Sequence, residues 1–240
     1  MSEVGLREVE LLGESVEYEL RRSTEASEPR IDVDIHGVTV VLPECADSLP
    51  TELLRENASW VLEKRRVYQR YREEAPERTF EAGAMFPYLG EPHELVVEPR
   101  QSHAVLDQTI RLRQSAVGQS SVKQVLQNFY RSRARQHFAE RADQYASRMS
   151  VEYEQIEIRN QRTKWGSCST SGTLGLNWRL MMASPEVIDY IVVHELAHLR
   201  ESNHTQAFWD FVAEYDPDYV EHAKWLDQNS TQLIFSKADL

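Results

Sequence analysis

Residues 184–199 carry a pattern of polar and apolar positions that predicts a buried helix. Ser184 suits the N-cap, Pro185 the first helical position, and Glu186 the first turn, where a carboxylate favours the helix dipole. The apolar residues that follow are Val187, Ile188, Ile191, Val192, Leu196 and Leu199. On a helix these apolar side chains would extend around more of the surface than the single apolar face of a half-exposed helix. We therefore expect a helix that begins at Pro185 and is buried on most sides.

Patterns elsewhere predict strands and helices in alternation. Alternating apolar residues over 31–42 predict two strands that turn near His36 and Gly37. A helical period predicts a helix over 51–74 and a long helix over 121–149, which Ser121 and Gln124 would open with a capping box. Short strands are expected within 80–97 and 104–117, and two more helices over 205–215 and 219–235. We expect residues 153–160 and 173–178 to pair as a hairpin around a turn-rich connection.

These elements indicate an α+β fold with three parts. Residues 1–30 form a polar segment, with a short helix or an opening strand at 4–12. Residues 31–118 form a β-rich subdomain with one helix, and residues 119–240 a domain that holds the long helix and the buried one. A chain of 240 residues suits one domain or two closely packed ones.

Composition and charge narrow the function classes. No apolar run approaches the ~20 residues that a bilayer requires, and the acidic N-terminus lacks a hydrophobic signal core. We therefore expect a cytoplasmic protein in which Cys45 and Cys168 are reduced. The net charge of −12 argues against strong binding to nucleic acid. The arginines at 131, 133, 135 and 141 are interpreted as a solvated helix face, with a local binding patch as the alternative.

The buried helix also carries a candidate metal-binding motif. Its residues His194, Glu195 and His198 have the spacing His-Glu-x-x-His. Residues four apart lie on one helix face, so both imidazoles can reach one Zn²⁺ at about 2.0–2.1 Å. Glu195 would lie outside the first shell, within reach of a water whose pKa the metal lowers toward ~7. This pattern predicts a catalytic zinc site with Glu195 as general base.

A catalytic zinc needs a third protein ligand and one open position. His204 follows His198 after five intervening residues, at a point where the chain can leave the helix and turn back. Glu214, Glu221 and His222 are rivals for this position. Cys168 could act as a fourth ligand and close the site, but we favour a buried neutral thiol. The remaining histidines at 36, 93, 103 and 137 are interpreted as ordinary.

Several short motifs occur together with this spacing. They are Phe86–Gly90, Phe129–Arg131, Trp165–Cys168, Leu174–Leu180, Asp189–Leu199, Asn203–His204, Phe208–Trp209 and Pro217–Tyr219. With these motifs the chain resembles the YgjP-like metallopeptidase domain family from about Ile31 to its C-terminus. The resemblance implies a zincin-like α+β fold, a small sheet over two helices that hold zinc, and His204 as third ligand. The histidine spacing is also similar to that of the Wss1-like and SprT-like proteases, which are associated with cleaving DNA-bound proteins.

The strand above the metal has a possible second role. In zincins an edge strand pairs with an extended substrate, so Gly175 and Asn177 on the strand 174–178 are candidates to contact it. Arg179, Lys164 and Tyr219 are candidates for the oxyanion stabiliser.

We expect a zinc-dependent peptidase acting on peptides or proteins. The alternatives are a binding module with a structural zinc in a nucleic-acid-processing complex, a protease acting on DNA-bound proteins, and hydrolysis of a non-peptide amide. The carboxylate of Glu195 argues against the first, since a structural site does not need it.

Overall fold

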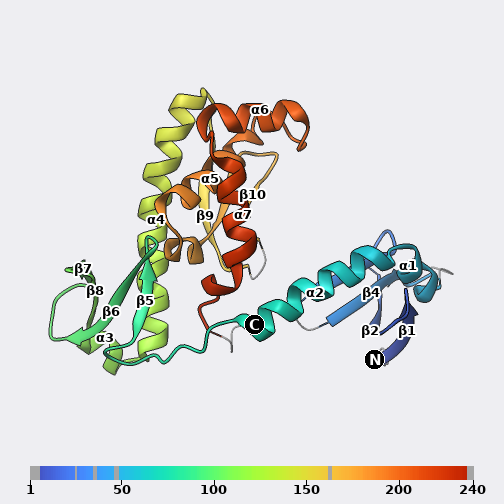
Figure 1. The fold of residues 1–240 in the computed structure, drawn as a ribbon, viewed down its shortest axis with the longest axis horizontal. Helices are drawn as coiled ribbons and strands as arrows, with labels where there is room; N and C mark the ends of the chain where they lie inside the picture. Colours follow the sequence, from blue (N-terminus) through green and yellow to red (C-terminus); the bar gives the residue numbers. More distant parts are fainter. Residues whose placement is uncertain (1–5, 25, 35–36, 46–48, 162–163, 237–240) are drawn as a thin grey trace. The chain divides into compact units, whose positions relative to one another are not determined.

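The chain contains one topology twice, four strands followed by a short and a long helix (Figure 1). The computed structural model describes residues 6–24, 26–34, 37–45, 49–161 and 164–236. The first copy comprises β1 (Leu6–Leu11), β2 (Glu14–Ser23), β3 (Arg30–Asp34), β4 (Gly37–Pro43), α1 (Pro50–Glu56) and α2 (Ala58–Glu74). The second comprises β5 (Met85–Tyr88), β6 (Glu91–Glu98), β7 (Ala104–Leu106), β8 (Thr109–Arg113), α3 (Gln114–Gly118) and α4 (Val122–Met149).

The two sheets agree in strand order and direction. The orders are β1-β2-β4-β3 and β5-β6-β8-β7, and in each sheet the two central strands are parallel and the outer pairs antiparallel. Even the first turns match: Leu12 and Gly13 have φ of 49° and 85°, and Leu89 and Gly90 have 49° and 82°. Two successive positive φ values characterise the type I′ turn that suits a tight hairpin, and glycine fits its second position at low cost.

The chain divides into two compact units with separate cores, Met1–Ala75 and Pro76–Asp239. In the first unit α1 and α2 cover one face of the sheet over a core from both hairpins and both helices. The division lies at Ala75 and not near residue 118, because Phe86, Leu95 and Ile110 of the second sheet share a core with α4 and the elements after it.

The second unit adds the elements that follow α4. They are β9 (Gln155–Arg159), β10 (Gly166–Cys168), β11 (Thr173–Asn177), α5 (Pro185–Ala197), α6 (Gln206–Tyr215) and α7 (Tyr219–Asn229), with 3₁₀ turns at Trp178–Met182 and Ser230–Leu233. The α4 helix packs against both β9 and α5. Its Arg141 guanidinium holds the Asp189 carboxylate of α5 by two hydrogen bonds of 2.5 Å. This arginine was expected on a solvated face but instead joins the two central helices.

Most predicted elements are present, and the α+β fold class is confirmed. Ser121 caps α4 by accepting a hydrogen bond from the Gln124 N–H at 3.2 Å. Residues 6–11 form a strand, and the helix expected over 51–74 is interrupted at Asn57. The turn expected near His36 lies partly outside the described residues. No helix in the described ranges is both long and apolar enough to cross a bilayer.

One prediction of strand pairing is wrong. The segments 153–160 and 173–178 do not form a hairpin, because β9 and β11 run parallel. The antiparallel partner of β11 is the short strand β10, which gives the order β10-β11-β9. The strand at the sheet edge is therefore β10, and β11 is central.

Candidate active site

Three histidines from α5 and the segment after it converge on one point. His194 lies in the last turn of α5, His198 at its C-cap, and His204 just before α6. The Nε2 atoms of His194 and His204 are 3.1 Å apart, and one ring nitrogen of each histidine lies within 4.8 Å of the others. Two nitrogens bound to a tetrahedral zinc at 2.0–2.1 Å are about 3.3 Å apart. The three imidazoles could therefore share one metal ion.

The protonation of the rings suits this role. Burial lowers the pKa of His194 to about 3, and burial also lowers the pKa of His198. Neutral imidazoles have the lone pair that a metal requires. His198 Nδ1 lies 3.3 Å from the Glu201 carbonyl, so Nδ1–H donates there and Nε2 is left to bind. His194 Nδ1 is buried without a partner in the described part of the chain.

A stack of aromatic rings orients His204, the most exposed of the three. Its ring stacks on Trp209 of α6 with centroids 5.6 Å apart and planes at 27°. Trp209 in turn stacks on Tyr219 of α7 at 5.3 Å and 15°. Phe208 packs edge-on to His204 at 4.8 Å and also contacts the other two rings. The ring of His204 thus has support from two helices.

We expect Trp209→Leu to weaken zinc binding about tenfold, because outer partners that orient a metal ligand typically contribute that much. Competition with a chromogenic chelator measures the affinity. Trp225→Leu is the control, since Trp225 is also a half-buried tryptophan in the same unit but lines a different cavity from the three histidines. Equal zinc affinity in the Trp209 variant and the unmodified protein would show that the stack does not position His204.

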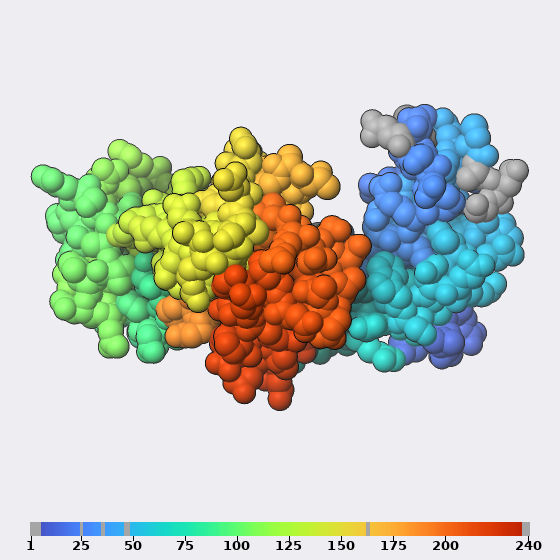
Figure 2. All heavy atoms as spheres, turned by 90° about the horizontal axis from the view of Figure 1, so that it is seen from above, coloured from blue at the N-terminus to red at the C-terminus, as the bar shows by residue number. Residues whose placement is uncertain are grey.

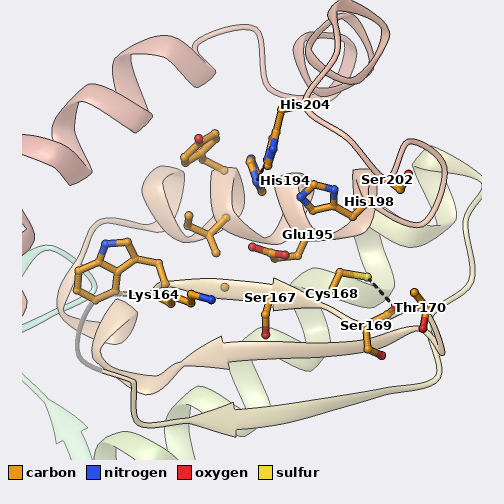
Figure 3. Close-up of a pocket in the computed structure, with 14 residues that line it drawn as sticks. Lys164, Ser167, Cys168, Ser169, Thr170, His194, Glu195, His198, Ser202 and His204 are labelled. Atoms are coloured by element: carbon orange, nitrogen blue, oxygen red, sulfur yellow. Dashed lines mark hydrogen bonds between the residues drawn. The ribbon is translucent and has the colours of Figure 1, made fainter. Parts of the chain in front are cut away.

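The Glu195 carboxylate points from α5 toward β10, into the space between this helix and strand (Figure 3). Its residue is 5% exposed, and burial raises its pKa to about 8, with a smaller opposing effect of the Lys164 ammonium. A Cβ atom added to Gly166 would lie 2.2 Å from Oε1, 2.6 Å from Cγ and 2.7 Å from Cδ of Glu195. Only glycine at 166 leaves room for the carboxylate in this position. A cation held by the histidines would lower the pKa of Glu195 again.

The three histidines and Glu195 line one cavity of about 580 Å³ between α5 and β10 (Figure 3). Its wall includes Lys164, Trp165 and the residues from Gly166 to Thr170. Tyr190, which the sequence analysis did not single out, also lines it, with its ring 5.9 Å from that of His194. Its position one turn before His194 on the same helix face was the available signal. Burial raises the pKa of Tyr190 to about 12.

Cys168 is in the cavity wall but apart from the metal ligands. Its thiol donates to the Ser169 carbonyl at 3.5 Å, and it is not in the cluster of histidine nitrogens. Burial and the nearby Glu195 carboxylate raise the pKa of the thiol. These observations favour the neutral thiol over a fourth ligand. Cys45 is exposed, and neither cysteine forms a disulfide.

The structure places the rival ligands elsewhere. His222 pairs with Asp216 at 2.9 Å and lines a different cavity together with Glu221. Glu214 is exposed on α6 and does not line the histidine cavity. The described histidines at 93, 103 and 137 lie outside the cluster, and His36 lies outside the described residues.

Gly175 and Asn177 of β11, which were expected to contact the substrate, are instead engaged within the protein. Asn177 uses its amide to donate to the carbonyls of Gln161 at 2.6 Å and Lys164 at 3.0 Å. Gly175 faces Ser167 of β10, since a Cβ there would be 2.6 Å from the Ser167 Oγ. Both residues therefore build the sheet, because β11 is its central strand.

The three oxyanion candidates differ in position. Arg179 is buried over the Trp178 ring at 4.7 Å and donates to Asn160 Oδ1 at 3.0 Å. Tyr219 belongs to the aromatic stack. Lys164 alone among them lines the cavity.

One family model covers most of the chain. The YgjP-like, metallopeptidase domain matches residues 27–229. The chain belongs to this family. The YgjP-like match includes β3 and all later strands, α1 to α7 and the whole histidine cluster. It identifies the protein as a member of a family of metallopeptidases, for which peptides or proteins are the substrates.

Two solved structures are similar to the YgjP-like chain over part of its length. One is the metallopeptidase zymogen abylysin of Pyrococcus abyssi, with 22% identity, 40% of this chain and 96% of that chain covered, and a TM-score of 0.37. The other is the metallopeptidase zymogen jannalysin of Methanocaldococcus jannaschii, with 25% identity, coverages of 38% and 95%, and a TM-score of 0.34. No curated protein matches the chain.

Proposed function

We propose that this YgjP-like protein is a zinc-dependent peptidase in which His194, His198 and His204 bind the metal and Glu195 is the general base. One observation carries the proposal: three imidazoles converge within 4.8 Å in the same cavity as a buried carboxylate. Three nitrogen ligands with an open side are the donor set of a catalytic zinc. Zinc bound there supplies Lewis-acid activation of water and of the scissile carbonyl.

The residues of the chain perform the proton transfers and position the substrate. Glu195 accepts a proton from the attacking water and passes it to the leaving amine. Because Gly166 lacks a side chain, this carboxylate can lie directly against the backbone of the edge strand β10. An extended peptide that adds to the free edge of β10 through backbone hydrogen bonds would present its scissile bond to Glu195.

The alternative of a structural zinc in a binding module fits these features less well. A structural site uses four protein ligands and is closed. Here the histidines open on a cavity of about 580 Å³, and the one thiol in its wall is not among the clustered ligand atoms.

We expect one zinc per chain, and expect His204→Ala to lose most of its zinc affinity because only two ligands remain. Elemental analysis after dialysis measures the content. His222→Ala is the control, since this histidine pairs with Asp216 in another cavity. If the His204 variant retains zinc as the unmodified protein does, the third ligand is a different residue.

A further inference from the structure

One segment of this acidic chain is strongly basic. Residues 99–139 contain seven Lys and Arg residues and one acidic residue, Asp107, in a chain whose net charge is −12. This basic segment comprises the loop before β7, the β7–β8 hairpin, α3 and the first part of α4. In Figure 1 its first part, with β7, β8 and α3 in green, lies at the other end of the second unit from α6, and Figure 2 shows the same green part at one side of the molecule. The hairpin and the loop before it therefore lie away from the helix that carries His194 and His198.

Three parts of this segment meet around the neighbouring rings of His103 and Phe129. The His103 ring packs edge-on to Phe129 at 6.4 Å, and the Arg133 guanidinium lies over the same ring at 5.5 Å. His103 Nδ1 accepts a hydrogen bond from the backbone N–H of Arg113 at 3.1 Å. The loop, the end of β8 and α4 thus bring their basic residues together around His103.

The carboxylates available there do not balance these arginines. Glu98 pairs with Arg100 at 3.1 Å and Arg111 at 3.6 Å, and among the described residues the exposed Asp107 pairs with Arg111 alone, at 4.0 Å. Arg113 and Arg133 have no carboxylate within 4.0 Å among the described residues. The Nε atoms of Arg100 and Arg113 are buried and have no hydrogen-bond partner in the described ranges. These guanidinium groups therefore have hydrogen-bond donors that no described residue uses.

The local electrostatics agree with this geometry. Burial lowers the pKa of His103, and the charges of Arg113, Arg100 and Arg133 lower it further in that order. No carboxylate in the described part of the chain acts on this ring in the opposite direction. Positive potential is thus concentrated at this ring although the chain as a whole is acidic.

We propose that Arg100, Arg113 and Arg133 form an anion-binding site beside His103 that takes a phosphate group. A carboxylate has two oxygens, which a single guanidinium fork can occupy, whereas a phosphate offers three or more oxygens to several forks. Three arginines around one point therefore match phosphate. The group could belong to a free phosphate compound or to a nucleic-acid strand. The site is independent of the peptidase chemistry.

The zinc-loaded full chain allows a direct test by NMR of the His103 ring. Inorganic phosphate is titrated at constant ionic strength, followed by a single-stranded 12-nucleotide DNA, with acetate as the reference anion. A saturable shift of the His103 signals with phosphate, absent with acetate, supports a site for a free phosphate compound. Saturation only with the oligonucleotide, with strong weakening by salt, supports a strand as the source. No saturable shift with either probe, or an equal shift with acetate, would overturn the proposal.

Substitutions of single arginines can distinguish a specific anion site from a general effect of positive charge. Arg113→Gln and Arg133→Gln should each weaken binding of the successful probe about tenfold, since a hydrogen bond to a charged group contributes that order. Arg135→Gln, an exposed residue one turn beyond Arg131 on α4, should change the affinity less than about twofold. Arg113→Lys keeps the charge but loses the fork, and should bind more weakly than the unmodified protein while remaining folded. Equal weakening in all of the variants would show a diffuse charge effect and no site.

Discussion

Glu195→Gln is expected to lower the rate of peptide hydrolysis by about 10²–10⁴-fold, the usual contribution of general acid–base catalysis. Glutamine keeps the size of the side chain but has no basic oxygen to accept the proton of water. Burial raises the pKa of Glu195 to about 8 in the metal-free protein, so an uncharged side chain suits this position. The variant should therefore fold with a similar melting temperature. Cleavage of a peptide library, followed by mass spectrometry, measures the loss once a substrate is found.

Zinc content is the control for this variant. Glu195 is not in the cluster of ligand nitrogens, so Glu195→Gln should bind one zinc as the unmodified protein does. Activity comparable to that of the unmodified protein would exclude Glu195 as the base. Loss of zinc together with activity would show that the carboxylate supports the metal, and would favour the structural-site alternative.

Gly166→Ala is expected to lower the same rate about 10²-fold without removing zinc. The new Cβ would lie 2.2 Å from Oε1 of Glu195, so the carboxylate must move by an ångström or more. A displacement of this size at a reacting group can cost about 10²-fold in rate. The backbone need not move, because the closest atoms belong to the end of a flexible side chain. Steady-state kinetics and zinc analysis of the same preparation measure both effects.

Two controls isolate the cause. Gly118→Ala adds the same methyl group where nothing lies within 4 Å, and should leave the activity unchanged. In a Glu195→Gln background, Gly166→Ala should cost little further activity, since both changes act on one group. If the two losses multiply, Gly166 acts by another route, such as substrate pairing along β10.

The features that could be predicted from the sequence are those that depend on residues close together in the chain. The start of α5 at Pro185 and the capping of α4 by Ser121 both depend only on neighbouring residues. The spacing of His194 and His198 follows from helix geometry, and their ring nitrogens do lie together with one of His204. The residue that closes this cluster could not be chosen by local rules alone. Its position depends on rings from two later helices, Trp209 and Tyr219.

Features that depend on distant pairing were missed. The direction of β9 relative to β11 is decided by the crossover between them, and the alternation of side chains is the same for parallel and antiparallel neighbours. The wrong pairing also made β11 the edge strand in place of β10, so the role of Gly166 was overlooked. The twofold occurrence of the β-β-β-β-α-α topology was likewise not found, because the copies share strand order but little sequence beyond Leu-Gly-Glu at their first turns.

The order of strands in the first sheet has a practical consequence for designing shorter fragments. The family match begins at residue 27, yet β2 lies between β1 and β4 and contributes Val16 and Tyr18 to the core of its unit. A fragment cut at residue 27 would leave β4 with a bare edge of unpaired N–H and C=O groups over uncovered apolar side chains. Such an edge is a template for aggregation. Fragments of this protein that keep the first unit therefore need residues 6–23, whereas the division at Ala75 and Pro76 coincides with a boundary between cores.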